Sequence, residues 1–439
     1  MQTLTSAVAA IASALVLFLP PTYGLVVYIA ALAWYPPYLA LSVGTIDFTV
    51  RRIVILAILA KLFLQTDLPS RFKLILLDKL VIAYFVAEII SGAVTTQSLM
   101  AFLENRSGAV FDMLLPYFAV RLIMINKHQY LMLLKAILII AAPLAIIGFY
   151  QCLTGENPVG FLQEYSTWGG GHPYNPMARH GLYRADVTFS HPIMFGLFFA
   201  MFGPVCVGLF SEKKGNKVLC SLGIALMGIG VFSSMSSGPF LAALSATIFI
   251  AFYRYRRYWK PALVVVILMC GIVEIISNRH FYDVLGDFTF SSRTAWYRSR
   301  LISVALAKGG MSGHWLTGFG QVDPGWGPKI DGRDHTDLVN QYLLILCSYG
   351  LVGLIPFIAV IVAALKIIFE VLRAAKSDSD TWLTWCLLGT LLGLLCAFMS
   401  VSLFGQPTTV FYMILGFVGS LPLIIYGNSQ VGSLNEVVK

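Results

Sequence analysis

The feature that most constrains this chain is a series of apolar runs, each about as long as a bilayer is thick. A membrane-spanning helix needs about 20 mostly apolar residues, and about twelve or thirteen such stretches occur here. Only 12% of the 439 residues are charged, against about 25% in soluble domains. We therefore expect one all-α integral membrane domain over residues 1–439. The expected spans are 4–19, 22–40, 52–67, 76–94, 108–124, 130–150, 188–210, 217–234, 237–253, 261–277, 350–372, 381–401 and 408–427.

Basic residues in the short connections indicate which side of the membrane each connection faces. Lys and Arg gather in the connections at 211–217 and 254–260, and the positive-inside rule puts such connections in the cytoplasm. Counting spans from these marks directs two long segments, 151–187 and 278–349, to the outer face. The side on which the first two spans begin stays open.

The formal net charge of +9 does not indicate nucleic acid binding, because Lys and Arg are scattered between apolar runs rather than gathered on one face. Near a membrane, this balance favours anionic lipid headgroups and an anionic, phosphate-bearing lipid substrate as partners. The seven His residues lack the spacings typical of metal ligands, and the Cys residues lie mostly inside apolar runs. The sequence therefore predicts no metal site, no disulfide framework and no cofactor.

The first outer segment ends in a polar cluster directly before a span. One interpretation is that Arg184 holds an anionic group at the membrane interface, with His191 nearby to donate a hydrogen bond. The alternative is that Arg184 and Asp186 only mark the boundary of the helix. Both interpretations stay open from composition alone.

The second outer segment is longer and richer in aromatic residues and arginines. Segments beyond about 15 residues without regular structure are usually functional or disordered, and the aromatic content argues against disorder. Residues 301–307 suit an amphipathic helix at the interface. On such a helix Arg293, Arg298 and Arg300 would present planar guanidinium groups to phosphate oxygens. The alternative is a helix that holds ordinary anionic lipids.

A histidine flanked by carboxylates precedes the apolar stretch 338–346. His335 lies between Asp334 and Asp337, and a histidine of this kind can act as a general base near neutral pH. A solvated loop histidine is the alternative. Within the expected spans the ionisable residues are few, chiefly Lys61 and Glu88, and these make only a thin case for a transport pathway.

Several short motifs occur in a characteristic order. Arg-x-Asp-x-Thr-Phe-Ser-His-Pro begins at Arg184, Ser-Arg-x-x-Trp at Ser292, Gly-Phe-Gly at Gly318 and Asp-His at Asp334, followed by Gln-Tyr-Leu and Ser-Tyr-Gly-Leu-Val-Gly. In this order, most clearly over 180–360, the chain resembles the O-antigen ligase and O-antigen polymerase superfamily of bacterial membrane glycosyltransferases.

The resemblance implies a GT-C-like membrane fold and a metal-independent, inverting glycosyltransferase in the bacterial inner membrane, with its active site facing the periplasm. Its donor would be a glycan on undecaprenyl diphosphate. An O-antigen ligase would transfer it to the lipid A core, and an O-antigen or exopolysaccharide polymerase to another glycan. The matching motifs imply that Arg184 and Arg293 bind the donor diphosphate and that His335 is the catalytic base. We expect His191, Arg298 and Asp334 to support them.

A lipid-linked glycan flippase or another transporter is the alternative from a different class. Transporters keep their polar site near the bilayer midplane, often at broken helices related by repeats. Here the His and Arg residues are concentrated in the outer segments, and no internal repeat is evident. The sequence therefore favours the enzyme.

Overall fold

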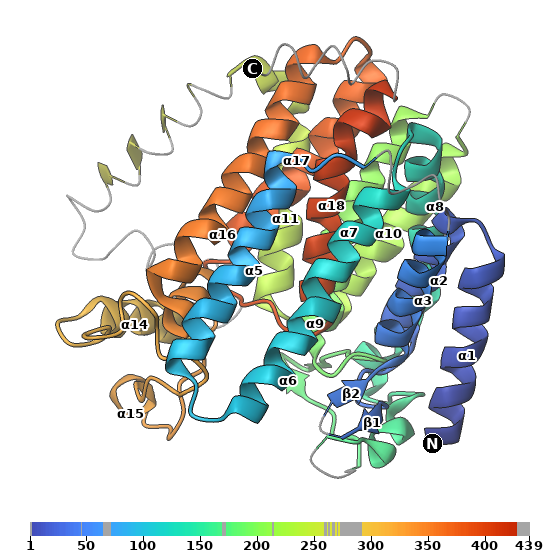
Figure 1. Cartoon of the computed structure of the whole chain (residues 1–439). Helices are drawn as coiled ribbons and strands as arrows, with labels where there is room; N and C mark the ends of the chain where they lie inside the picture. The colour runs from blue at the N-terminus through green and yellow to red at the C-terminus, as the bar shows by residue number, and fades with distance from the viewer. Residues whose placement is uncertain are drawn as a thin grey trace.

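Long helices run side by side through the molecule, and two small β-hairpins lie at one end of the bundle (Figure 1). The structure is a computed structural model. For Val43 and residues 292–295 it describes the backbone only. The residues that it describes are 2–44, 46–64, 72–168, 173–212, 215–258, 261, 264–265, 268–269, 271–272 and 292–427.

Among the described residues, the first half of the chain forms seven α-helices, one π-helical turn and two strands that pair antiparallel. The π-helix interrupts what would otherwise be one helix, so that α6, η1 and α7 follow one another without a loop. The elements are α1 (Gln2–Phe18), α2 (Pro21–Trp34), β1 (Leu41–Val43), β2 (Ile46–Phe48), α3 (Val50–Leu64), α5 (Leu76–Thr95), α6 (Leu99–Ala109), η1 (Val110–Leu114), α7 (Leu115–Ile123) and α8 (Lys127–Thr154).

Within the described residues, the second half contains one short hairpin, and its other regular elements are helices. Its elements are η2 (Gly160–Tyr165), β3 (Ala178–Arg179), β4 (Leu182–Tyr183), α9 (Pro192–Cys206), η3 (Val207–Ser211), α10 (Lys217–Ser233), α11 (Ser237–Ala251), η4 (Phe252–Tyr258), α14 (Ser292–Leu306), α15 (Gly327–Ile330), α16 (Gln341–Ala374), α17 (Asp378–Ala397) and α18 (Gln406–Tyr426). Here η2, η3 and η4 are 3₁₀-helices.

Six helices among the described residues are long and apolar enough to cross a membrane, as expected for a multi-pass membrane protein. They are α8, α9 with η3, α11 with η4, α16, α17 and α18, and three further apolar helices are shorter. We expected about twelve spans. The difference has local causes: α2 ends at Trp34 before Pro36 and Pro37, and α5 carries Asp78, Lys79 and Glu88. Most of the expected span 261–277 lies outside the described residues.

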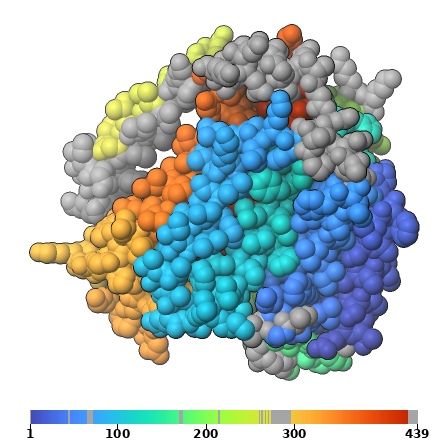
Figure 2. Space-filling model, in the orientation of Figure 1, coloured from blue at the N-terminus to red at the C-terminus, as the bar shows by residue number. Residues whose placement is uncertain are grey.

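One end of the bundle carries ion pairs between short connections, and the other carries the hairpins and the long loops. At one end, the connections before α8, α10 and α17 meet, with Lys127 Nζ 2.6 Å from Asp380 and Lys135 Nζ 2.8 Å from Glu212. The opposite end, here called the loop end, carries both hairpins, α14 and α15 (Figure 1). In Figure 2 the residues of α14 and α15 stand out from the bundle beside α5 and α6.

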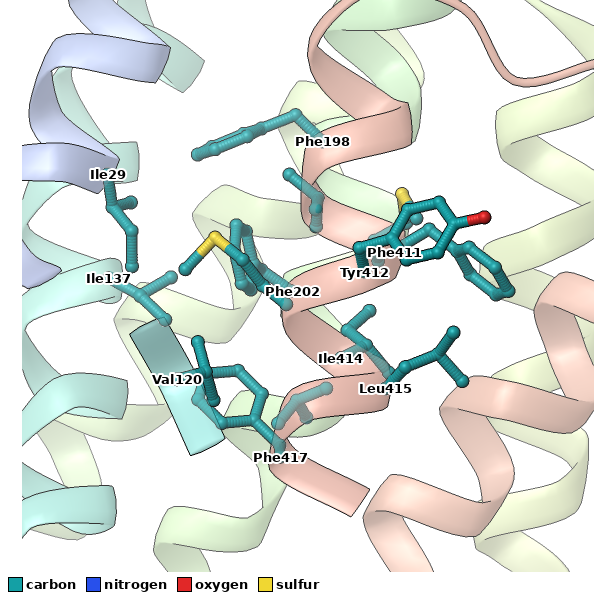
Figure 3. Close-up of a cluster of buried hydrophobic side chains, with 14 of the residues drawn as sticks. Ile29, Val120, Ile137, Phe198, Phe202, Phe411, Tyr412, Ile414, Leu415 and Phe417 are labelled. Carbon is teal, nitrogen blue, oxygen red and sulfur yellow. The ribbon is translucent and has the colours of Figure 1, made fainter. Parts of the chain in front are cut away.

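The core is centred on α18, which packs against α7, α8, α9, α16 and α17. Figure 3 shows Phe198 and Phe202 of α9 and Phe417 of α18 among the buried side chains of this core. Because lipid tails are as apolar as these side chains, close van der Waals packing rather than the hydrophobic effect stabilises helix contacts within a bilayer.

Helix α16 begins nine residues before the expected span and is broken at Gly350, whose backbone has φ 61° and ψ −160°. Residues 341–349 therefore form a short helical section within the expected outer segment 278–349. At Gly350 a Cβ atom would collide with the carbonyl of Leu316. The break thus makes room for part of the second outer segment to cross α16.

Candidate functional site

The backbone that follows Arg184 is held by a network of side-chain hydrogen bonds. Gln151 Oε1 accepts from the N–H groups of Asp186 (3.2 Å) and Val187 (3.0 Å), and Gln151 Nε2 donates to Asp186 Oδ1 at 2.7 Å. Asn157 Nδ2 donates to the carbonyl of Val187 at 2.9 Å. Val187 has φ 50°, which is unusual for a β-branched residue and is maintained only where the surroundings impose it.

The turn between α10 and α11 supports two arginines of the first outer segment. Arg184 Nη2 donates to Ser236 Oγ at 2.9 Å, and Arg179 Nη1 donates to the carbonyl of Met235 at 3.1 Å. The N–H of Ala185 also donates to the carbonyl of Ser233 at 2.8 Å. The β3–β4 hairpin and this turn therefore fix both guanidinium groups at the loop end.

A third arginine joins them from α14. The positive charge of Arg179 acts on both Arg184 and Arg298, although Arg298 lies over a hundred positions further along the chain. Burial, and then the charge of Arg179, lower the pKa of Arg184 and that of Arg298 to about 10. We call Arg179, Arg184 and Arg298 the arginine cluster.

The arginine cluster has unused hydrogen-bonding capacity. Arg184 Nε and Arg298 Nε and Nη1 are buried without a hydrogen-bond partner. Within the described part of the chain none of the three arginines forms an ion pair with a carboxylate. Buried donors without acceptors are costly, so the arrangement is that of a site prepared for an anion with several oxygens.

The second outer segment is anchored at the break in α16. The N–H of Phe319 donates to the carbonyl of Cys347 at 2.6 Å, and the N–H of Leu351 donates to that of Trp315 at 2.8 Å. A Cβ atom at Gly318 (φ 71°) would collide with the backbone of Cys347. Close backbone approach therefore explains the first glycine of the Gly-Phe-Gly motif, which positions the loop that leads to His335.

His335 lies exposed in that loop, near Asp323. Asp323 also accepts hydrogen bonds from the N–H (2.7 Å) and hydroxyl (2.8 Å) of Thr336, the next residue. The N–H of Asp337 donates to Tyr297 Oη at 2.9 Å, and Asp337 acts electrostatically on Arg298. The loop of His335 is thus joined to the helix that carries Arg298.

His191 caps α9, with Nδ1 accepting a hydrogen bond from the N–H of Ile193 at 3.1 Å. Burial, and then the charge of Arg184, lower the pKa of His191 to about 4. The ring is therefore neutral at physiological pH and carries its proton on Nε2, which leaves Nε2 as a donor.

The structure brings some of the predicted residues together. Arg184 acts through its charge on His191, and Arg179 acts on both Arg184 and Arg298, whereas His335 and Asp334 are exposed on the loop before α16. Arg293 lies in α14, but its side chain is outside the described residues.

Arg179 was not predicted from the sequence as a residue of the site. The available signal was the His-Gly turn that follows it, which pairs Arg179 with Leu182 in the hairpin and sets it beside Arg184. An isolated hairpin of two-residue strands has no alternating pattern long enough to be recognised.

The two charges predicted inside spans have local partners. Lys61 Nζ donates to the carbonyls of Val16 (3.0 Å), Leu17 (3.1 Å) and Leu19, at the end of α1. Glu88 Oε2 is 2.8 Å from Arg106 Nη1. Among the described residues no group of three or more His, Cys, Asp or Glu side chains gathers as metal ligands.

No family model matches the chain, and no curated protein matches it.

Proposed function

We propose that the protein is a membrane glycosyltransferase that moves a glycan from undecaprenyl diphosphate to a sugar hydroxyl. The observation that carries the proposal is the arginine cluster, in which buried guanidinium nitrogens of Arg184 and Arg298 lack a hydrogen-bond partner and both groups lie within reach of the charge of Arg179. A lipid diphosphate has the charge and the several oxygens that such a cluster is suited to bind.

The chemistry follows from what the residues can do. His335 takes the proton of the acceptor hydroxyl, whose oxygen attacks the anomeric carbon of the donor sugar. The bond from that carbon to the diphosphate oxygen breaks, and undecaprenyl diphosphate leaves with the bonding electron pair. The arginine cluster stabilises the negative charge that develops on the leaving group, usually the largest single contribution to catalysis of this kind. A single displacement inverts the anomeric centre.

The proposal has two forms, which differ in the molecule that accepts the glycan. We favour an O-antigen ligase that transfers the glycan to the lipid A core, facing the periplasm from the bacterial inner membrane. An O-antigen or exopolysaccharide polymerase would use the same chemistry on a second lipid-linked glycan.

The proposal is tested with purified protein, an undecaprenyl-diphosphate glycan and both acceptor types, with and without a chelator. We expect transfer to one acceptor, unaffected by chelation. A general base contributes about 10²- to 10⁴-fold in rate, so His335→Ala should lose that much turnover while it still binds the donor. His128→Ala, an exposed histidine at the opposite end of the bundle, is the matched control.

Two outcomes would contradict this assignment. Turnover by folded His335→Ala at the rate of the control would remove His335 as the base. Loss of donor binding by His335→Ala, to the same extent as by Arg298→Ala, would place His335 among the diphosphate ligands and make His191 the next candidate for the base.

A further inference from the structure

A second polar feature lies inside the helix bundle, separate from the arginine cluster: a cavity of about 210 Å³ between α5, η1, α16 and α18. A single water needs only about 10–15 Å³, whereas pockets for drug-sized ligands have about 300–1,000 Å³. The cavity therefore has room for one ring rather than for an extended chain.

The walls of this cavity combine aromatic rings with short polar groups. The ring of Tyr84 lies 5.5 Å from that of Phe357, and Phe411 lies 5.5 Å from Tyr412. In Figure 3 the hydroxyl oxygen of Tyr412 points away from the apolar cluster around Phe198. The other polar lining residues include Glu88, Gln341, Ser348 and Thr408.

Several polar groups of the cavity have no partner in the protein. The hydroxyls of Ser348, Thr408 and Tyr412 form no hydrogen bond with any described residue, and they are not enclosed by protein atoms. Gln341 uses its Oε1 to accept from the N–H of Leu403 at 2.6 Å, which leaves its amide N–H₂ as a donor. Within a membrane protein such groups need a polar occupant.

The cavity carries no net charge of its own. Glu88, its one carboxylate, is balanced by Arg106, whose second terminal nitrogen donates to Tyr349 Oη at 2.7 Å. An anion or a cation would therefore find no opposite charge here. A neutral ligand with several hydroxyls fits the lining better.

The cavity adjoins the candidate site along two segments of chain. Gln341 follows Asp337 by four residues, at most about 14 Å of extended chain, and Asp337 acts on Arg298. On the other side Leu403 lines the cavity, and the ring of the next residue, Phe404, lies 5.9 Å from that of His191. One substrate molecule can therefore reach both places.

We propose that this cavity binds a single neutral sugar ring of the glycan substrate. The apolar C–H face of the ring would lie on the aromatic wall, and its hydroxyls would pair with Ser348, Thr408, Tyr412 and Gln341. The inference rests on the proposed function and deepens it, because it assigns the sugar and the diphosphate to two separate sites.

The test measures binding of two probes to the full chain in nanodiscs, since detergents with sugar headgroups would compete. Saturation-transfer NMR detects methyl glucoside and methyl N-acetylglucosaminide, and a titration measures inorganic pyrophosphate. We expect Ser348→Phe, which fills the cavity, to abolish glycoside binding. Ile355→Phe, on a lipid-facing position of the same helix with 63% of its surface exposed, should bind as the wild type does.

A second variant keeps the volume of the cavity and removes two hydroxyls. We expect Thr408→Val/Tyr412→Phe to weaken glycoside binding about tenfold, the effect of two lost hydrogen bonds. Equal glycoside binding by wild type, Ser348→Phe and the double variant would overturn the proposal, as would pyrophosphate binding without glycoside binding. Glycoside binding without pyrophosphate binding would instead uphold the sugar site and contradict the diphosphate site.

Discussion

Arg121 in the helix bundle and the arginine cluster at the loop end are used in opposite ways. Near the end opposite the loops, Asp78 accepts from Arg121 Nε (2.8 Å) and Nη2 (3.0 Å) and from Tyr117 Oη (2.6 Å), all buried. Every oxygen of that carboxylate is used. In the arginine cluster, by contrast, guanidinium nitrogens of Arg184 and Arg298 are buried without partners.

We interpret this difference as one between charged groups that stabilise the fold and charged groups kept for binding a ligand. A buried ion pair with complete hydrogen bonding fixes how helices meet, and losing one partner is costly because the other is left uncompensated. A group of like charges without partners destabilises the free protein, and such perturbed groups concentrate at functional sites. The predictions below test whether the two sets of arginines behave in these two ways.

The largest effect is expected on stability at the paired site. Arg121→Ala leaves the carboxylate of Asp78 buried without a cation, which costs about 3–5 kcal/mol. Arg298→Ala, which removes an unpaired cation, should leave the free energy of unfolding unchanged or slightly higher. Denaturant unfolding of both variants in the same detergent measures this. A loss of stability in Arg298→Ala as large as that in Arg121→Ala would show that Arg298, like Arg121, stabilises the fold.

For transfer activity, we expect the large losses in variants of the arginine cluster. Arg184→Ala and Arg298→Ala should each lower transfer by about 10²- to 10³-fold, as removal of one preorganised donor does in other enzymes. Arg300→Ala is the control, since Arg300 is exposed on the same helix. Initial rates at saturating acceptor report the effect. Folded Arg298→Ala that transfers as fast as Arg300→Ala would exclude a role in binding the diphosphate.

The pH dependence of stability should change when Asp186 is neutralised. Burial raises the pKa of Asp186 to about 6, so its contribution to stability is present below about pH 3.8 and is lost as the pH rises through 6. His191, with its pKa lowered to about 4, acts oppositely and loses stability as the pH falls from 6.5 to 4.

In wild type these two contributions offset each other. Asp186→Asn keeps an oxygen acceptor for Gln151 but leaves only the contribution of His191. We expect its Tm to fall more steeply on acidification than the Tm of wild type, and to be higher than that of wild type near pH 8. Parallel Tm curves for the two proteins would show that Asp186 does not titrate in this range.

The smallest effect concerns the shape of the cation. Arg298→Lys keeps the positive charge but loses the planar fork that matches phosphate oxygens. We expect transfer about tenfold below wild type, between the rates of wild type and Arg298→Ala. Wild-type rates in Arg298→Lys would indicate that charge alone matters at this position.

Local sequence was sufficient for much of the fold. The apolar runs predicted a helix in every expected span that the structure describes, because the free energy of placing a segment in a bilayer depends on its own length and composition. Helices α6 and α15 were not expected. The helical segment within the second outer segment was also expected and is seen as α14. Boundaries were less accurate: α2 is shorter than expected, and α16 begins at Gln341 rather than near residue 350.

Arg184, Arg298 and His335 could be assigned to segments between spans from the sequence, since charges are excluded from lipid-facing positions. The proximity of Arg179 to Arg184 and Arg298, and the cavity lined by unpaired hydroxyls, could be recognised only from the packed helices. Composition acts over the length of one helix, so it predicts spans. Contacts between distant residues depend instead on how separate helices pack and on where backbone breaks such as Gly350 let one segment cross another.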